Sequence, residues 1–416
     1  MNFDDTPQEA GFRSQARAWI AANAPRQYEE ELRKSSLGRT QLKGANVLQV
    51  AKAWQKTKAE AEAGWACLHW PKDYGGRGAS PIERVIWQQE EGPYGKLSAM
   101  FIIGHGMCGP TMMAYASEAH KRKYLPPLAS GETIWCQLFS EPSAGSDVAG
   151  LRTRAERRGE EWLVNGQKIW TSGAHYSDFG ILLTRTDPTA PKHQGLTMFF
   201  LDMKSPGVEV RPIKQASGQS DFNEVYFTDV RIPDSQRLGE VNDGWNVALT
   251  TLMNERMSIG AGVATGFPEL FEFCSNLMLE NGPAIDDRNV RSRLANWAVK
   301  ASGLKYTSFR AISALSKGER PGPENSIGKL VAGSMIQDVA AFALDLQGAA
   351  GVLNGTEAEL DGKFQAMLLR APGTRVEGGT DEIMRNIIAE RVLGLPGDIR
   401  VDKDVPFNQI PTKGRN

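Results

Sequence analysis

Apolar residues recur every three or four positions from residue 6 to about residue 131, which is the period of an amphipathic helix. Phe12, Ala16, Trp19 and Ile20 form one such series, and a second series begins at Val47. The pattern therefore predicts an N-terminal region, residues 1–131, that is helical throughout.

A different period begins at about residue 132 and continues to residue 235. Short runs rich in Val, Ile, Phe and Trp alternate with Gly, Pro and charged residues, as antiparallel strands do. Asn165-Gly166 lies between two of the runs and indicates a two-residue type I′ hairpin turn. The region predicts a small antiparallel β-barrel or sandwich, with strands at residues 162–164, 168–170, 179–185, 196–203, 208–213 and 224–230.

The helical period returns over residues 236–395 and predicts a four-helix bundle. Its segments cover residues 245–265, 268–280, 290–315, 327–347 and 380–392. A tail rich in Pro, Asp and Lys follows at residues 396–416, and we expect it to wrap the surface or to remain loose. The fold class is thus α+β and multi-domain, with a central β domain between two helical domains.

Charge and composition narrow the classes of function. The 48 basic and 49 acidic residues give a net charge of −1, so no global field favours nucleic acid or an anionic membrane. No apolar run reaches 18 residues, which predicts no membrane span. The acidic, polar N-terminus lacks the features of a signal or transit peptide, so we expect a cytoplasmic protein.

Metal and disulfide chemistry find little support in the sequence. The four cysteines are scattered among apolar neighbours without C-x-x-C spacing, which predicts buried free thiols. The five histidines form no metal-like grouping, so we expect no metal site.

The most informative stretch runs from Cys136 to Ser172. It joins a turn of small residues around Ser143–Asp147 to a strand that ends on Trp170, Thr171 and Ser172. Small residues let backbone N–H groups approach a flat polar ligand closely, and a tryptophan supplies an apolar wall. The pattern predicts a ligand-binding loop followed by a strand.

The wording of this stretch resembles the flavin-binding signature of the acyl-CoA dehydrogenase family, whose members are FAD-dependent. The order of a helical, a β and a second helical domain is also that of the family. Further matching segments occur along nearly the whole chain: Gly64-Trp65, Trp70-Pro71, Tyr74–Gly78, Lys121–Pro127, Asn254–Arg256 and Gly378–Ile383.

The resemblance implies roles for individual residues. Phe139 and Ser140 match the loop that lies against the flavin pyrimidine, and Trp170 and Ser172 match residues that flank the flavin ring. Ser146 matches a serine beside the acyl-CoA and the flavin pyrophosphate. Thr380 and Glu382 match family positions that bind the adenosine end of FAD. The glycine-rich loop Gly348–Gly351 loosely resembles a family loop that contacts the flavin pyrophosphate across a subunit interface.

The reaction that the resemblance implies is α,β-dehydrogenation of an acyl-CoA thioester to the trans-2-enoyl-CoA. A carboxylate removes the weakly acidic α-proton, which requires a raised carboxylate pKa from burial. The β-hydrogen leaves as hydride to the flavin, and the electrons pass on to an electron-transfer flavoprotein. Oligomers of the family suggest a homodimer, a homotetramer or a heteromer with a paralogous subunit.

Two glutamates compete for the role of the base. Glu377 lies near the usual family position, but alignment on Gly379-Thr380 places that position at Gly378. Glu255 directly precedes Arg256, as the base does in isovaleryl-CoA and long-chain-type members. We expect Glu255 to be the base and Arg256 to contact the CoA phosphates.

Helical periodicity bears on this choice independently of the resemblance. Trp245, Leu249, Leu252, Ile259 and Val263 share one apolar stripe, and Glu255 lies at its edge. A structural ion pair with Arg256, or a solvated helix edge, is the alternative explanation of Glu255.

The sequence departs from the family pattern at one segment. Many members carry an R-x-x-F-G segment that reaches the FAD of a neighbouring subunit, whereas residues 279–288 read LENGPAIDDR here. This departure leaves open whether the chain forms a homotetramer or needs a partner subunit.

Two further functions also stay open: an acyl-CoA oxidase or flavin monooxygenase on the same fold, and a non-catalytic partner subunit of a heteromeric dehydrogenase.

Overall fold

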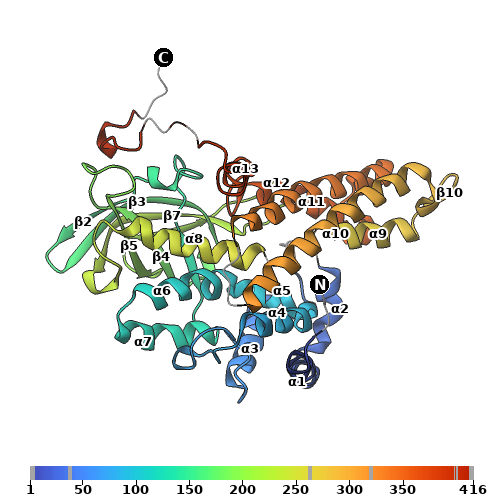
Figure 1. The fold of residues 1–416 in the computed structure, drawn as a ribbon, viewed down its shortest axis with the longest axis horizontal. Helices are drawn as coiled ribbons and strands as arrows, with labels where there is room; N and C mark the ends of the chain where they lie inside the picture. Colours follow the sequence, from blue (N-terminus) through green and yellow to red (C-terminus); the bar gives the residue numbers. More distant parts are fainter. Residues whose placement is uncertain are drawn as a thin grey trace.

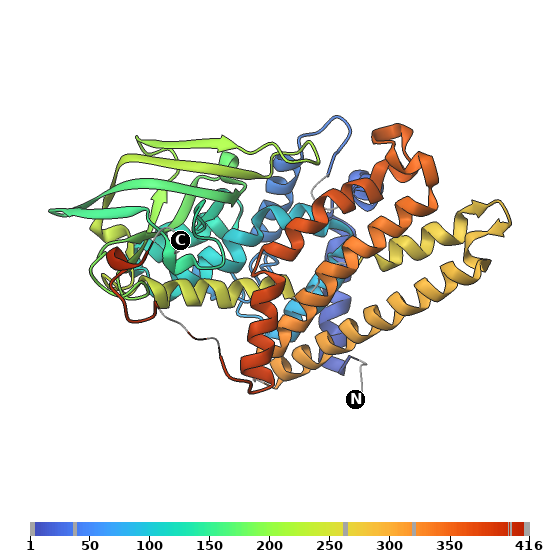
Figure 2. The same ribbon diagram turned by 90° about the horizontal axis from the view of Figure 1, so that it is seen from above.

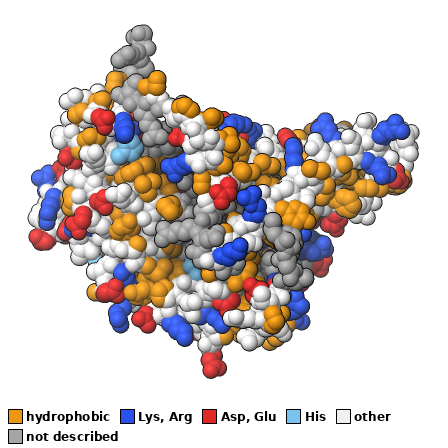
Figure 3. Space-filling model, viewed as in Figure 1, with side chains coloured by type: hydrophobic (Ala, Val, Ile, Leu, Met, Phe, Trp, Pro, Cys, Tyr) orange, Lys and Arg blue, Asp and Glu red, His pale blue; other side chains and the backbone are white. Residues whose placement is uncertain are grey.

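The computed structural model describes residues 5–35, 40–260, 265–317, 322–397, 399 and 402–411. Helices form the first part of the chain, a β-sheet forms the middle and helices form the rest (Figure 1). The predicted order of a helical, a β and a second helical region is confirmed. Acidic and basic side chains are interspersed over the face that Figure 3 shows.

The N-terminal helices surround a core rich in tryptophan. Trp65 and Trp87 stack with their ring centroids 4.7 Å apart. Buried Glu91 accepts hydrogen bonds from the indole nitrogens of Trp54 and Trp87 and pairs with Lys58 at 2.7 Å. The helices are α1 (Pro7–Asn23), α2 (Glu29–Lys34), α3 (Val47–Glu60), α4 (Pro81–Glu90), α5 (Gly95–Ser98), α6 (Gly109–Tyr115) and α7 (Glu118–Ala129).

The middle of the chain forms one open sheet. The predicted β domain is therefore confirmed, but the sheet does not close into a barrel or form a sandwich. Strands pair in the order β6-β7-β3-β2-β4-β5-β8, and β1 pairs in parallel with β4. The edge strand β6 carries exposed Glu209 and Arg211 and ends at Pro212, features that keep an edge unpaired. The strands are β1 (Trp135–Leu138), β2 (Arg154–Arg158), β3 (Glu161–Ser172), β4 (Phe179–Arg185), β5 (Leu196–Asp202), β6 (Val208–Pro212), β7 (Phe222–Pro233) and β8 (Arg237–Leu238).

The hairpin predicted at Asn165-Gly166 is wrong. Strand β3 runs through these residues, and β2 turns into β3 at Gly159 instead, which has a φ of 66°. The pairing register with β7 shifts at Gly166, so the dipeptide forms a bulge. A Cβ on Gly166 would lie 2.5 Å from Oγ1 of Thr153, so the position requires glycine.

The C-terminal helices share one core, which agrees with the predicted four-helix bundle. Buried residues of α9, α10, α11 and α12 form this core: Leu270, Phe273, Val290, Trp297, Met335, Val339 and Phe364. Helix α12 was not predicted, because Pro372 and Gly373 interrupt its pattern. The elements are α9 (Phe267–Asn276), a hairpin of β9 (Met278–Leu279) and β10 (Gly282–Pro283), α10 (Arg288–Ser316), α11 (Ser326–Leu346), α12 (Lys363–Val376) and α13 (Asp381–Ile387).

Among the described residues, α11 is long and apolar enough to cross a membrane by length and composition, and the pair Gly92–Phe101 and Gly104–Tyr115, bent by 69°, passes the same test only when counted as one span. The mean hydropathy of α11 reaches 1.4, but it lies within the bundle and packs on α9, α10, α12 and α13. This apolarity is that of a bundle core helix. All four cysteines are buried and free, as predicted, and no group of three or more potential metal ligands occurs in the described part of the chain.

Helix α8 (Gly244–Gly260) connects the sheet with the C-terminal bundle (Figure 2). Its first residue presses against β5, because a Cβ on Gly244 would lie 2.7 Å from the backbone N and Cα of Thr197. Further along, Thr251 and Thr111 of α6 join their hydroxyls at 2.8 Å. Glycine at residue 244 therefore sets how closely α8 packs on the sheet.

We predict that Gly244→Ala lowers the free energy of unfolding by about 1–3 kcal/mol, because the added methyl group overpacks the contact with β5. Urea denaturation of wild type and variant measures the change. Gly303→Ala is the control, since residue 303 lies in α10 with nothing within 4 Å of an added Cβ. That substitution should stabilise by up to about 1 kcal/mol through helix propensity; equal effects of both would contradict the account.

Candidate functional site

The loop between β1 and β2, residues 139–153, is tied to strand β3 by Lys168. This lysine is fully buried. Its ammonium donates to the carbonyl oxygen of Phe139 and to Oε1 of Glu141, both at 2.9 Å. A buried charge is expensive unless it is paired and hydrogen-bonded, and both conditions are met here.

Glu141 closes the loop from the other side. Its carboxylate accepts backbone hydrogen bonds from Arg152 at 2.6 Å and Thr153 at 2.9 Å. Although burial opposes ionisation, Lys168 and these donors lower the pKa of the Glu141 carboxyl below its ordinary value. The two ends of the loop are thus joined through one ionised pair.

The part of the loop between these anchors is exposed in places, although Ala144, Ala149 and Leu151 are buried in the core. Ser143, Gly145 and Ser146 are exposed, and Ser140 is partly buried. The carbonyl oxygen of Ser140 accepts a hydrogen bond of 2.9 Å from the backbone of Ile169. Ser140 therefore lies directly beside the strand segment that carries Trp170.

Trp170 occupies a strained position at a second irregularity of β3. The pairing register with β7 shifts between Lys168 and Thr171, and Trp170 has a φ of 60°, in the left-handed region. Bulky residues adopt this conformation rarely and at a cost of about 1–3 kcal/mol. The side chain is nevertheless 55% exposed and contacts the edge of Phe222, 6.2 Å away between centroids. Because the Trp170 ring is largely exposed, its burial does not offset the free-energy cost of this backbone conformation.

Two buried polar atoms near Trp170 lack hydrogen-bond partners within the described ranges. They are Oγ1 of Thr171 and Nη1 of Arg370, whose guanidinium lies 5.5 Å from the Phe222 ring centroid. Ser172 is paired with Phe222 across the β3–β7 ladder. Together these groups offer an apolar face, hydroxyls and unused hydrogen-bonding capacity. Such a surface fits a flat ring with polar edges, as a flavin has.

The buried face of α8 differs from the predicted apolar stripe. Leu249 is 38% exposed, whereas Val247, Ala248 and Thr251 are fully buried. Glu255 follows Thr251 by four residues and Ala248 by seven, so it continues the buried face and is itself partly buried. The helix is rotated relative to the prediction because its small residues pack on β5 and α6. This rotation brings Glu255 further inward.

The side chains of Arg256 and Ile259 are not among those that the structure describes, and Val263 lies outside the described residues. Their predicted roles stay predictions.

The competing glutamate, Glu377, follows α12 and is held by Arg370. Both of its carboxylate oxygens accept hydrogen bonds from Nη2 of Arg370, at 2.9 and 2.7 Å. Because Arg370 also lies against Phe222, this ion pair is close to Trp170. Glu377 is thus near the candidate site but bound to an arginine.

The two segments expected at the adenosine and pyrophosphate of FAD lie far apart within one chain. Thr380 begins α13, accepting a hydrogen bond from the backbone of Ile383. Lys329, near the start of α11, donates to the carbonyl oxygen of Gly379 next to it. The Gly348–Val352 turn follows the other end of α11. A helix rise of about 1.5 Å per residue separates the two segments by about 30 Å.

Glu382 is exposed on α13, and Arg385 pairs with it at 3.5 Å. The structure therefore places Ser140 beside the strand that carries Trp170 and Ser172, whereas Phe139 is buried in the core and Ser146 is exposed further along the loop. Thr380 and Glu382 lie on the C-terminal bundle.

Four residues of this site received no role from the sequence: Glu141, Lys168, Phe222 and Arg370. Lys168 lies within a hydrophobic strand, and a buried lysine requires an acidic partner. The sequence could therefore have predicted a buried ion pair at this position. Phe222 and Arg370 join the site only through the pairing of β7 and the docking of α12. Sequence reasoning has no access to these contacts.

Comparison with known proteins agrees with this architecture. The acyl-CoA dehydrogenase N-terminal, middle and C-terminal domain families match residues 6–132, 136–230 and 242–393. Acyl-CoA dehydrogenase IpdE1 of Mycobacterium tuberculosis is 35% identical over 94% of this chain and 98% of its own length. Acyl-CoA dehydrogenase FadE34 of the same organism is 38% identical over 81% of this chain, which spans only 46% of that relative. The solved structure of the Tcur3481-Tcur3483 steroid ACAD superposes with a TM-score of 0.79 at 27% identity, covering 96% of this chain and all of that one.

We predict that Lys168→Met lowers the free energy of unfolding by about 3–5 kcal/mol, because it leaves the Glu141 carboxylate buried without its cation. Chemical denaturation measures the loss. Removing both charges in Lys168→Met with Glu141→Gln should cost less than the sum of the single substitutions.

The matched control is Lys204→Met, because the Lys204 side chain is 78% exposed. Its effect should stay within about 0.5 kcal/mol. A Lys168→Met protein as stable as this control would show that the buried pair does not hold the loop.

Proposed function

This chain belongs to the acyl-CoA dehydrogenase family, and from that premise we propose that it oxidises an acyl-CoA thioester to the trans-2-enoyl-CoA with FAD. The observation that carries the proposal is the strained, exposed Trp170 with Ser140 and Ser172 beside it. Backbone strain that is not offset by burial of the side chain is typical of functional sites. An apolar wall flanked by hydroxyls is what a flavin ring requires.

Within this proposal, Phe139, Ser140, Trp170 and Ser172 surround the flavin ring and Ser146 lies toward the phosphates. Thr380 and Glu382 bind the adenosine end. When bound, FAD supplies the acceptor for the two electrons of the hydride. The unpartnered polar atoms near Trp170 support the assignment, since a polar ring edge would satisfy them.

Glu255 is the proposed base. It lies on the face of α8 that buries Ala248 and Thr251, and it is itself partly buried. Glu255 takes the α-proton as the C–H bond breaks, the α,β double bond forms, and the β-hydrogen leaves as hydride. Arg256, next along the helix, is proposed to contact the CoA phosphates.

The geometry of Glu377 favours Glu255 further. Both oxygens of Glu377 are engaged by Arg370, so proton abstraction there would first break a two-bond ion pair. We propose that Glu377 positions Arg370 rather than acting as the base.

A complete FAD site is proposed to need a second chain. The segments around Thr380 and Gly348 lie about 30 Å apart along α11, too far for both to reach the same flavin from one chain. A homodimer, a homotetramer or a heteromer with a paralogous subunit would bring them together. The native mass of the purified protein distinguishes these from a monomer.

The finer features of the proposal rest on similarity. Likeness to the steroid ACAD points to a bulky, steroid-type acyl group on the CoA thioester. An electron-transfer flavoprotein is the proposed electron acceptor, and the cytoplasm the proposed location.

We predict that Glu255→Gln retains FAD but lowers kcat by about 10²–10⁴-fold, the usual contribution of a general base. Anaerobic mixing with the acyl-CoA substrate should then leave the flavin absorbance nearly unchanged. Glu377→Gln, a matched neutral substitution near the same site, should retain most of the activity. Normal turnover by Glu255→Gln together with an inactive Glu377→Gln would reverse the assignment.

The electron acceptor provides a separate prediction. After anaerobic reduction by substrate, the reduced protein should reoxidise slowly in air and quickly with an electron-transfer flavoprotein. Stopped-flow absorbance records both rates. Rapid reoxidation in air with release of peroxide would instead identify an oxidase.

A further inference from the structure

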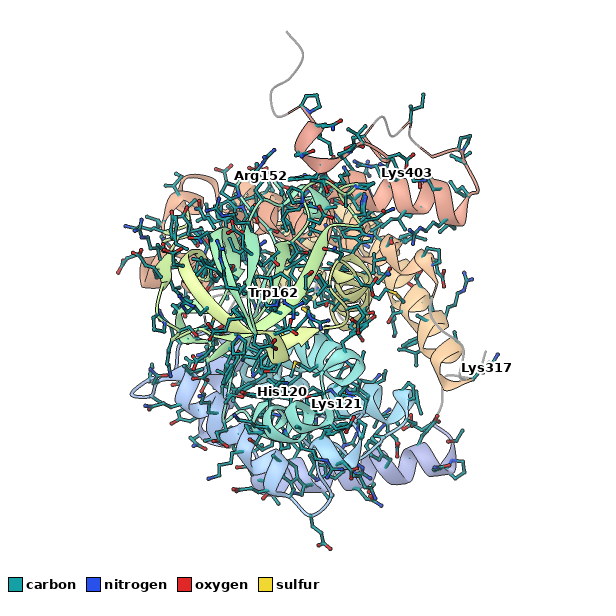
Figure 4. All side chains as sticks on the ribbon, turned by 90° about the vertical axis from the view of Figure 1, so that its left-hand side faces the viewer. His120, Lys121, Arg152, Trp162, Lys317 and Lys403 are labelled. Atoms are coloured by element: carbon teal, nitrogen blue, oxygen red, sulfur yellow. The ribbon has the colours of Figure 1, made fainter. Side chains whose placement is uncertain are left out.

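We infer that the C-terminal segment 402–411 is a strap that positions the 143–147 loop for a phosphate-bearing ligand. Residues 402–411 lie beside the sheet and away from α13, where Figure 1 shows them in dark red. In Figure 4, Lys403 and Arg152 lie at the same end of the molecule, above the sheet. The inference rests on the proposed function, which assigns phosphates to this loop.

Backbone contacts hold the strap to the β4–β5 connection. The N–H groups of Phe407 and Asn408 donate to the carbonyl oxygens of Ala190 and Pro188, both at 2.9 Å. Pro406 also forms an antiparallel bridge with Pro191. The strap is therefore docked by a short stretch of sheet-like pairing.

Phe407 anchors the strap between two arginines. Its ring is buried, with the guanidinium of Arg185 3.9 Å and that of Arg152 5.3 Å from its centroid. Arg185 in turn donates to the carbonyl oxygens of Ala149 and Lys192. Since the Arg152 backbone binds Glu141, Phe407 contacts the far end of the ligand-binding loop.

Asp402 is linked through Lys192 to Asp147, in the middle of the loop. Buried Lys192 binds one oxygen of Asp402 at 2.6 Å and both oxygens of Asp147 at 3.1 and 3.0 Å. Asp147 directly follows Ser146, the serine proposed to lie toward the phosphates. Its side chain is 58% exposed, so few other contacts would hold it. The lysine thus links the strap to the ligand-contacting turn.

The strap is not part of the hydrophobic cores of the sheet, which consist of residues up to position 248. Its effect should therefore fall on the order of the 143–147 loop rather than on folding. A loop ordered in advance binds more tightly, because less conformational entropy is lost on binding. Asp402 and Phe407 are positioning residues in this sense.

The test uses full-length Asp402→Asn and Phe407→Ala. Each single substitution should raise the KM for acyl-CoA by about two- to tenfold, the effect of freeing one ordered side chain. Because neither residue touches the reacting atoms, kcat should stay within about twofold of wild type. Asn408→Ala is the control, since the backbone of Asn408 makes its contact.

Hydrogen exchange of the ligand-free proteins gives a readout that does not depend on turnover. Backbone amides of residues 141–150 should exchange faster in the variants than in wild type or Asn408→Ala, while strands β3 and β7 keep their protection. Unchanged exchange, or unchanged KM despite faster exchange, would overturn the inference. A uniform loss of protection in Asp402→Asn would also overturn it, as the strap would then serve folding.

The two proposals can fail separately. If wild type turns over no acyl-CoA, the proposed function fails, while the exchange measurement still decides whether the strap orders the loop. If wild type is active and the variants match it in both readouts, only the strap inference fails.

Discussion

The buried ion pair between Lys168 and Glu141 is the constraint on which the candidate site depends. Through it, strand β3 holds both ends of the 139–153 loop with an ammonium, a carboxylate and two backbone N–H donors. The residues exposed between these ends, such as Ser143, Gly145 and Ser146, can then be small, because the buried pair fixes where the loop begins and ends. Removing either charge would leave its partner buried and unpaired.

The same strand carries the strain of the site. Lys168 is fixed in the interior, and the register with β7 shifts before Thr171, so Trp170 lies in the bulge between them. Strain of this kind persists only where the surroundings over-determine it. The buried pair on one side and the β3–β7 ladder on the other supply that constraint, which presents Trp170 outward. Helix α8 packs closely on β5 through Gly244, and the same helix carries the partly buried Glu255.

Much of the fold was predictable because periodicity is local. Residues 179–185 were predicted as a strand and form β4, and the predicted segment 327–347 is α11 shifted by one residue. The errors arose where tertiary contacts overrode local signals: Asn165-Gly166 became a bulge against Thr153, and α8 turned its small residues inward. The loop residues of the site followed from the resemblance. Phe222, Arg370 and the strap could not be predicted, since each joins the site through pairing or docking between distant segments.

We propose that this surface binds FAD and brings an acyl-CoA to it. The most direct measurement is the absorbance spectrum of the purified wild-type protein during anaerobic titration with acyl-CoA thioesters, both straight-chain and steroid-derived. We expect a yellow protein whose flavin absorbance is bleached by one class of thioester. A colourless protein that takes up no FAD would contradict this proposal.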